Sequence, residues 1–84
     1  MSIEFNDYVM SQLYGLAEAN GYDLHSDPNY TPRTVRGYKL CPQDISRADR
    51  RAVPWVPLSE LLPQLLSWGT VYTDAYHKNT LAIH

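Results

Sequence analysis

The stretch NDYVMSQLYGLAEANG, residues 6–21, predicts an amphipathic helix, and the rest of the fold can be worked out from it. Asn6 is placed to cap the first turn, and Gly21 can take the left-handed conformation that ends a helix. Apolar side chains recur at helical spacing and form one stripe, made of Phe5, Val9, Leu13 and Leu16. The opposite side is polar and acidic, with Glu4, Asp7, Ser11 and Glu18.

Outward from this helix the chain alternates between strand and helix signals. TVRGYKLC, residues 34–41, predicts a strand that ends at Pro42. Ser46 and Asp49 have the spacing of a capping box, which predicts the start of a short helix. The other expected elements are a long connection, an extended stretch, a third helix and two terminal strands, at residues 22–33, 53–57, 58–68, 70–76 and 80–83.

These elements predict an α+β fold class, with three helices and a small antiparallel sheet in a single domain, residues 1–84. The order helix, strand, helix, helix, strand, strand is that of a winged helix-turn-helix domain, while other α+β arrangements stay open. Pro63 belongs in a first helical turn, so the regular part of the third helix is expected to begin there. The expected core is formed by Leu13, Leu16, Leu62 and Leu65.

Composition places the chain among folded, reduced proteins. Of its 84 residues, 44% are hydrophobic and 19% charged, which are globular values. Cys41 is the single cysteine, which excludes an internal disulfide and the usual zinc-finger layouts and suits a reducing cytoplasm. The acidic N-terminal sequence is unlike a signal peptide, and no apolar run is long enough for a membrane span. We therefore expect a cytoplasmic protein without a membrane partner.

Charge is distributed in blocks along the chain. Residues 1–27 carry five acids and no base, whereas residues 33–51 carry six bases against two acids. Such segregation indicates either that the two regions pair with each other or that each faces a different surface. The six bases are Arg33, Arg36, Lys39, Arg47, Arg50 and Arg51.

The residues that usually carry catalysis or bind metals form no recognisable motif. No histidine or acid has a sequence relation to Cys41 that implies a catalytic dyad, and His25-Ser26-Asp27 reads as the polar start of a loop. His77 and His84 are too few for a zinc site. The glycines are scattered and form no phosphate loop. We expect no enzyme activity, no metal and no cofactor.

Arginine and tyrosine predict a binding surface. Arg47, Arg50 and Arg51 share one face of the second helix, while its other face, Ile45, Ala48 and Ala52, is expected in the core. Tyrosine and arginine are enriched at protein interfaces. The candidate partner-binding residues are Tyr30, Arg33, Arg36, Tyr38, Arg47, Arg50 and Arg51. Trp55, in the extended VPWVP stretch, is expected to be buried under the third helix.

The leading prediction is a small non-enzymatic regulator or inhibitor, acting as a monomer or homodimer on a protein or nucleoprotein partner with an acidic patch. The chain's size, its lack of motifs and its charge segregation suit an accessory protein of a phage or mobile element. The alternative is a winged-helix DNA-binding regulator, in which the bases, including Lys39, would contact phosphates. Against it, the third helix presents Ser59, Glu60, Gln64 and Ser67 with no cation, and the pI is about 5.8. A clasp between the basic face and the acidic first helix, within one chain or in a dimer, also stays open.

Overall fold

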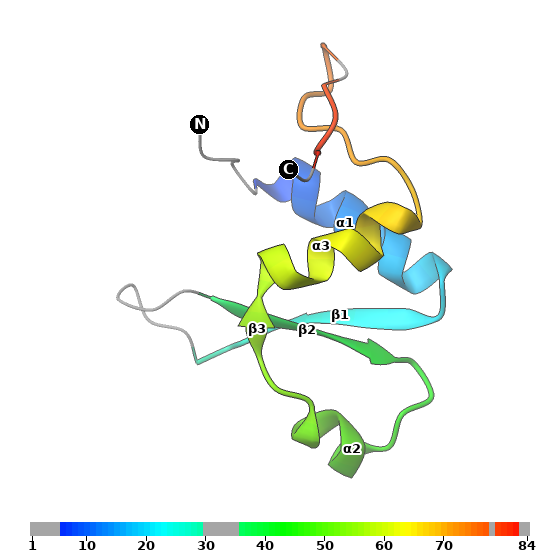
Figure 1. The fold of residues 1–84 in the computed structure, drawn as a ribbon, viewed down its shortest axis with the longest axis vertical. Coiled ribbons are helices and arrows are strands. Elements are labelled where there is room, and N and C mark those ends of the chain that lie inside the picture. The colour runs from blue at the N-terminus through cyan, green and yellow to red at the C-terminus, as the bar shows by residue number, and fades with distance from the viewer. Residues whose placement is uncertain (1–5, 30–35, 78, 83–84) are drawn as a thin grey trace.

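The computed structural model describes residues 6–29, 36–77 and 79–82, and its elements follow the order αββαβα (Figure 1). The three strands form one antiparallel sheet in the order β1-β2-β3. Helices α1 and α3 pack on one face of this sheet, whereas α2 lies on its other side. The elements are α1 (Asp7–Ala19), β1 (Tyr22–Ser26), β2 (Gly37–Pro42), α2 (Arg47–Ala52), β3 (Val56–Pro57) and α3 (Leu58–Ser67).

The α+β class is confirmed, and so are both predicted ends of the first helix. The Asn6 side chain accepts a hydrogen bond from the Val9 N–H at 3.0 Å, which satisfies one of the free amides of the first turn. Gly21 follows the helix with a φ of 80°, a left-handed conformation that favours glycine. The chain therefore turns straight into β1.

Strand β1 corrects the expectation of a long connection over residues 22–33. Tyr22–Ser26 pairs antiparallel with β2, so that Leu24 lies opposite Leu40. The strand was missed because its polar residues, Asp23, His25 and Ser26, hide the apolar alternation. Residues 30–33 of the predicted connection lie outside the described residues, and so do residues 34–35 of the predicted strand.

The C-terminal segment follows the expected order, but it does not extend the sheet. In the described residues, Tyr72 and Thr80 form a single antiparallel bridge in place of two full strands. Gln12 of α1 fixes this segment, because its side chain donates to the Tyr72 carbonyl at 2.8 Å and accepts from the Tyr72 N–H at 2.9 Å. The sheet is thus built from β1, β2 and β3, which differs from a winged domain, where the terminal strands join the first.

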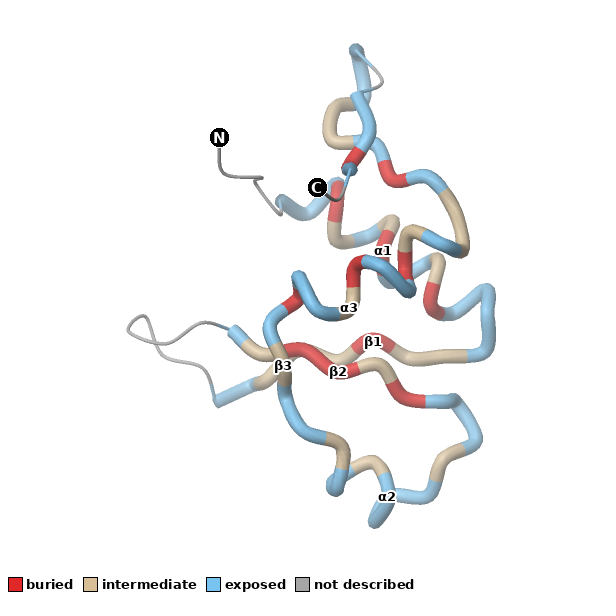
Figure 2. The backbone as a smooth tube through the Cα atoms, viewed as in Figure 1, coloured by how far each residue is buried: buried red, intermediate tan, exposed pale blue. Residues whose placement is uncertain are grey.

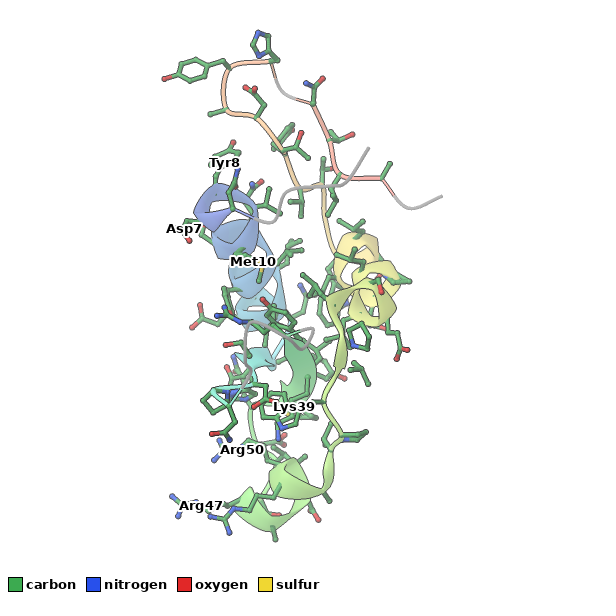
Figure 3. All side chains as sticks on the ribbon, turned by 90° about the vertical axis from the view of Figure 1, so that its left-hand side faces the viewer. Asp7, Tyr8, Met10, Lys39, Arg47 and Arg50 are labelled. Carbon is green, nitrogen blue, oxygen red and sulfur yellow. The ribbon has the colours of Figure 1, made fainter. Side chains whose placement is uncertain are left out.

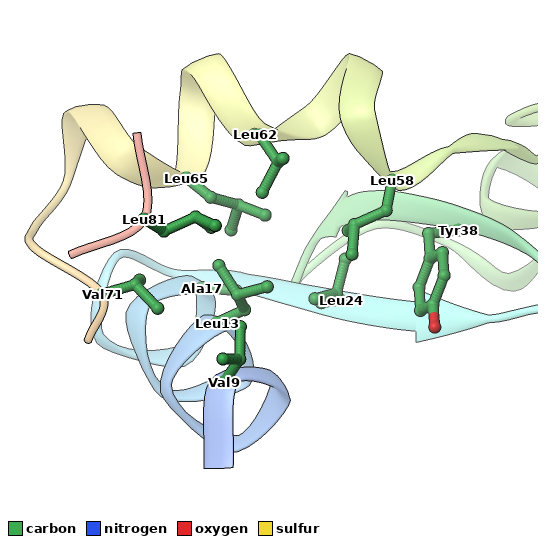
Figure 4. Close-up of a cluster of buried hydrophobic side chains, with 10 residues drawn as sticks. All are labelled: Val9, Leu13, Ala17, Leu24, Tyr38, Leu58, Leu62, Leu65, Val71 and Leu81. Carbon is green, nitrogen blue, oxygen red and sulfur yellow. The ribbon is translucent and has the colours of Figure 1, made fainter. Parts of the chain in front are cut away.

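The core lies between the sheet and the two helices α1 and α3 (Figures 2 and 4). Leu13, Leu62 and Leu65 are buried as predicted, and Leu16 is half-buried against them. The full cluster is Val9, Leu13, Ala17, Leu24, Tyr38, Leu58, Leu62, Leu65, Val71 and Leu81. In so short a chain the core is thin, so each of these side chains matters for stability.

Helix α3 corrects the expectation that regular helix begins at Pro63. It begins at Leu58 and includes Pro63 in its interior. A proline there leaves the carbonyl four residues earlier, that of Ser59, without its helical donor. Both Ser59 and Pro63 are exposed, so water can satisfy that carbonyl.

The turn after Tyr72 is held by one carboxylate and should be sensitive to pH. Asp74 accepts hydrogen bonds from the His77 N–H, the His77 ring and the Tyr76 N–H, which hold the pKa of its carboxyl below its ordinary value. Because the pKa of Asp74 is lower in the folded state, its ionised carboxylate stabilises the turn at any pH above the ordinary pKa of an aspartate. This stabilisation is lost as the pH falls through the folded-state pKa. We expect the Tyr76 and His77 amides to lose their hydrogen-bonded NMR shifts on acidification below about pH 4. Asp74→Ala should abolish the pH dependence; an unchanged titration in that variant would contradict the assignment.

Candidate partner-binding site

The predicted basic helix lies on a segment that leaves the sheet after β2 and returns to it at β3. We call this segment, residues 43–55, the basic arm; it contains α2 and lies on the side of the sheet opposite α1 and α3 (Figure 1). Ser46 caps α2 as predicted, accepting a hydrogen bond from the Asp49 N–H at 3.1 Å. Arg50 and Arg51 occupy the last turn, where positive charge is favourable.

The arm corrects the expectation that one face of this helix enters the core. Helix α2 has no buried residue: Ala48 and Ala52 are exposed, and Ile45 before the helix is half-buried (Figure 2). The helix is only six residues long, and the main core is on the opposite side of the sheet. Packing in the core therefore does not explain why this helix has its sequence.

The three arginines of α2 are at least partly open to solvent. Arg47 and Arg51 are exposed and Arg50 is half-buried. Arg47 and Arg50 point to the same side of the arm (Figure 3). Within residues 6–29, 36–77 and 79–82, none of the three forms an ion pair, the one such pair being His77 with Asp74. Three uncompensated guanidinium groups thus gather on one short helix.

The other predicted site residues are placed differently. Tyr38 is 9% exposed and belongs to the core cluster, so it is no surface contact (Figure 4). Tyr38 is buried because side chains alternate along a strand: it lies opposite Ser26 and Val56, on the face of the sheet that packs under the helices. Arg36 is exposed just before β2, whereas Tyr30 and Arg33 lie outside the described residues.

Trp55 is a surface residue that the sequence interpretation placed in the core. It is 39% exposed and sits at the return of the arm to the sheet, next to β3. A β-carbon added to Gly37 would lie 2.7 Å from the Trp55 β-carbon, so the tryptophan lies directly against the start of β2. Pro54 and Pro57 disfavour helix at the residues before them, which predicts the extended backbone found here but not the exposure of Trp55.

Lys39 has a role that sequence alone did not reveal. It was interpreted as a surface cation, but it is only 7% exposed. Its ammonium donates a hydrogen bond to the Arg50 carbonyl at 2.7 Å and lies 4.3 Å from the centre of the Trp55 ring. A strand residue thus contacts both the helical part of the arm and its return.

The acidic first helix does not neutralise the arm within the molecule. Asp7 on α1 and Arg47 on α2 lie far apart, with the sheet between the two helices (Figures 1 and 3). No ion pair joins the two helices in the part of the chain that the structure describes. Among the described residues the clasp within one chain is therefore not formed, and the two charged surfaces face different surroundings.

The residues considered for catalysis or metal binding are dispersed. Cys41 is fully buried, and His77 is exposed beside Asp74; His84 is outside the described residues. Among the described residues, no group of three or more His, Cys, Asp or Glu side chains is placed to hold a metal ion.

Comparison with other proteins adds no relative. The chain matches no protein-family model, and no curated protein or solved structure is similar enough to it to count as related. No helix in the described part of the chain has the length and apolar character needed to cross a bilayer. The functional inference therefore depends on the chemistry of the arm.

Proposed function

We propose that this chain is a small binding protein that attaches to an acidic surface of a protein partner through the basic arm. The observation that carries the proposal is the group Arg47, Arg50 and Arg51: three guanidinium groups without ion pairs in the described residues, on a helix that buries nothing. Trp55, which is 39% exposed where the same arm returns to the sheet, is the candidate aromatic contact.

The chemistry of these side chains suits carboxylates. A guanidinium presents several N–H donors in a planar fork, which binds a carboxylate through two parallel hydrogen bonds. Tryptophan and arginine are enriched at the hot spots of interfaces, the few positions where replacing the side chain by alanine costs most of the binding energy. An acidic patch with a neighbouring apolar spot would therefore match the arm in both charge and side-chain chemistry.

A protein of this kind acts by occupying a surface. We infer a regulator or inhibitor, working in the cytoplasm, where a buried free thiol such as Cys41 stays reduced. Its size and its attachment through one compact segment fit an accessory protein of a phage or mobile element. The proposal covers a nucleoprotein only where the acidic surface belongs to its protein component.

Duplex DNA is the less favoured partner. The exposed residues of α3, the helix that would enter a groove, are Ser59, Glu60, Pro63, Gln64 and Ser67, with no cation among them. A groove-reading helix usually brings at least one arginine or lysine to guanine or phosphate. The terminal segment also does not join the sheet as a wing would.

A pull-down with nuclease treatment tests the proposal. The tagged chain is incubated with lysate of its native host, at physiological salt, before and after digestion of DNA and RNA. We expect a discrete protein partner that survives the digestion. Recovery that depends on nucleic acid, together with sequence-selective duplex binding that persists at physiological salt, would replace the proposal with the DNA-binding alternative.

A further inference from the structure

The second face of the sheet, opposite the main core, carries an unusual set of side chains. Antiparallel register places Lys39 opposite His25, and Cys41 opposite Asp23, on this one face. Cys41 is fully buried, yet it does not belong to the cluster under α1 and α3. The basic arm lies on this side of the sheet, so we expect the arm to cover Cys41 (Figure 1).

A buried ammonium needs partners, and among the described residues Lys39 finds them in the arm. Removing a charge from water is costly unless hydrogen bonds and nearby partial charges compensate for the loss. The Arg50 carbonyl compensates at 2.7 Å, at the end of α2 where backbone carbonyls concentrate negative charge. The face of the Trp55 ring, 4.3 Å away, adds a cation–π contact. Both partners move away if the arm leaves the sheet.

We propose that Lys39 is a positioning residue that fixes the basic arm against the sheet and so sets the relative placement of its arginines and Trp55. It contacts no partner molecule itself. Its ammonium joins the helical part of the arm to the returning tryptophan, and the arm brings no buried side chain of its own from α2. The consequence for binding rests on the proposed function, whereas the positioning of the arm does not.

Lys39→Met tests this role, because methionine keeps most of the apolar stem and removes the ammonium. Loss of the hydrogen bond and the cation–π contact is expected to raise arm opening by about tenfold or more. Three readouts should report it: faster alkylation of Cys41 by iodoacetamide, faster amide exchange over residues 47–53, and a shifted Trp55 indole resonance. The Trp68 indole, which packs on Tyr22 with ring centres 5.2 Å apart, should not shift.

Arg47→Met is the matched control, since it also replaces a cation by methionine but lies on the exposed side of the arm. It should leave Cys41 alkylation and arm exchange at wild-type rates. Amides of Val9, Leu13 and Ala17 should stay protected in both variants, which separates arm opening from global unfolding. Wild-type alkylation and exchange rates in Lys39→Met would overturn the proposal.

A second variant keeps the test decisive if Lys39→Met fails to fold. Gly37→Ala retains the lysine but places a β-carbon 2.7 Å from that of Trp55, which forces the return of the arm to shift. The same increase in Cys41 alkylation is expected, and its absence would contradict the proposal. If Lys39→Met frees the arm while partner recovery is unchanged, the positioning role stands and the proposed function fails.

Discussion

Replacing Leu13 or Leu65 by alanine is expected to lower the free energy of unfolding by about 2–5 kcal/mol. Each side chain is completely buried, Leu13 on α1 and Leu65 on α3, and they lie in the cluster where the two helices meet the sheet (Figure 4). The cost has two parts, the lost burial of the removed atoms and the cavity that they leave. For a domain with a total stability of about 5–10 kcal/mol, either substitution removes a large fraction.

Urea denaturation followed by circular dichroism measures the effect. Gln64→Ala is the control: it changes an exposed position on the same helix as Leu65 and should stay within about 0.5 kcal/mol of wild type. A wild-type denaturation midpoint for both leucine variants would show that α1 and α3 do not meet through these faces.

Arg47→Glu combined with Arg51→Glu is expected to weaken partner binding by about a hundredfold or more, while the fold is retained. Removing one central interfacial arginine commonly costs 2 kcal/mol or more, and each 1.4 kcal/mol is a factor of ten, as an order-of-magnitude guide. The introduced carboxylates also repel an acidic surface. Both positions are exposed and without ion pairs in the described residues, so the melting temperature should hardly change.

The control for this variant places the same two glutamates elsewhere. Ser59→Glu with Gln64→Glu adds negative charge to the exposed side of α3 and should leave partner binding near wild type. If the arginine variant unfolds, the arginines are structural. If it instead converts a dimer into monomers, they hold two copies together, as in the clasp between the basic arm and the acidic first helix.

The helices were predictable because their signals are local. The cap at Asn6, the glycine after α1 and the capping-box spacing at Ser46 depend on a few neighbouring residues, and the structure contains each of them. Strand β1 was not predictable in this way. Its pairing energy comes from β2, which begins more than ten residues later, and its polar residues hide the alternation.

The candidate site was predictable in its residue types but not in its geometry. The arginines of α2 were recognised from charge and helical spacing. The same spacing assigned Ala48 and Ala52 to a core that lies on the opposite side of the sheet. The sequence predicts a buried Trp55 and a surface Lys39, whereas the structure has Lys39 buried and Trp55 exposed. Which of the two is buried depends on how the arm folds back onto the sheet, and no local pattern encodes that contact.

Site-specific photo-cross-linking tests the central claim, that the basic arm is the surface that meets the partner. A photoreactive amino acid replaces Ala48, which is exposed on the same short helix as the arginines, or Gln64, which is exposed on α3. After nuclease treatment at physiological salt, illumination should link a discrete protein to position 48 and not to position 64. Cross-linking to the same protein from position 64, with none from position 48, would contradict the account and move the binding surface to the other side of the sheet.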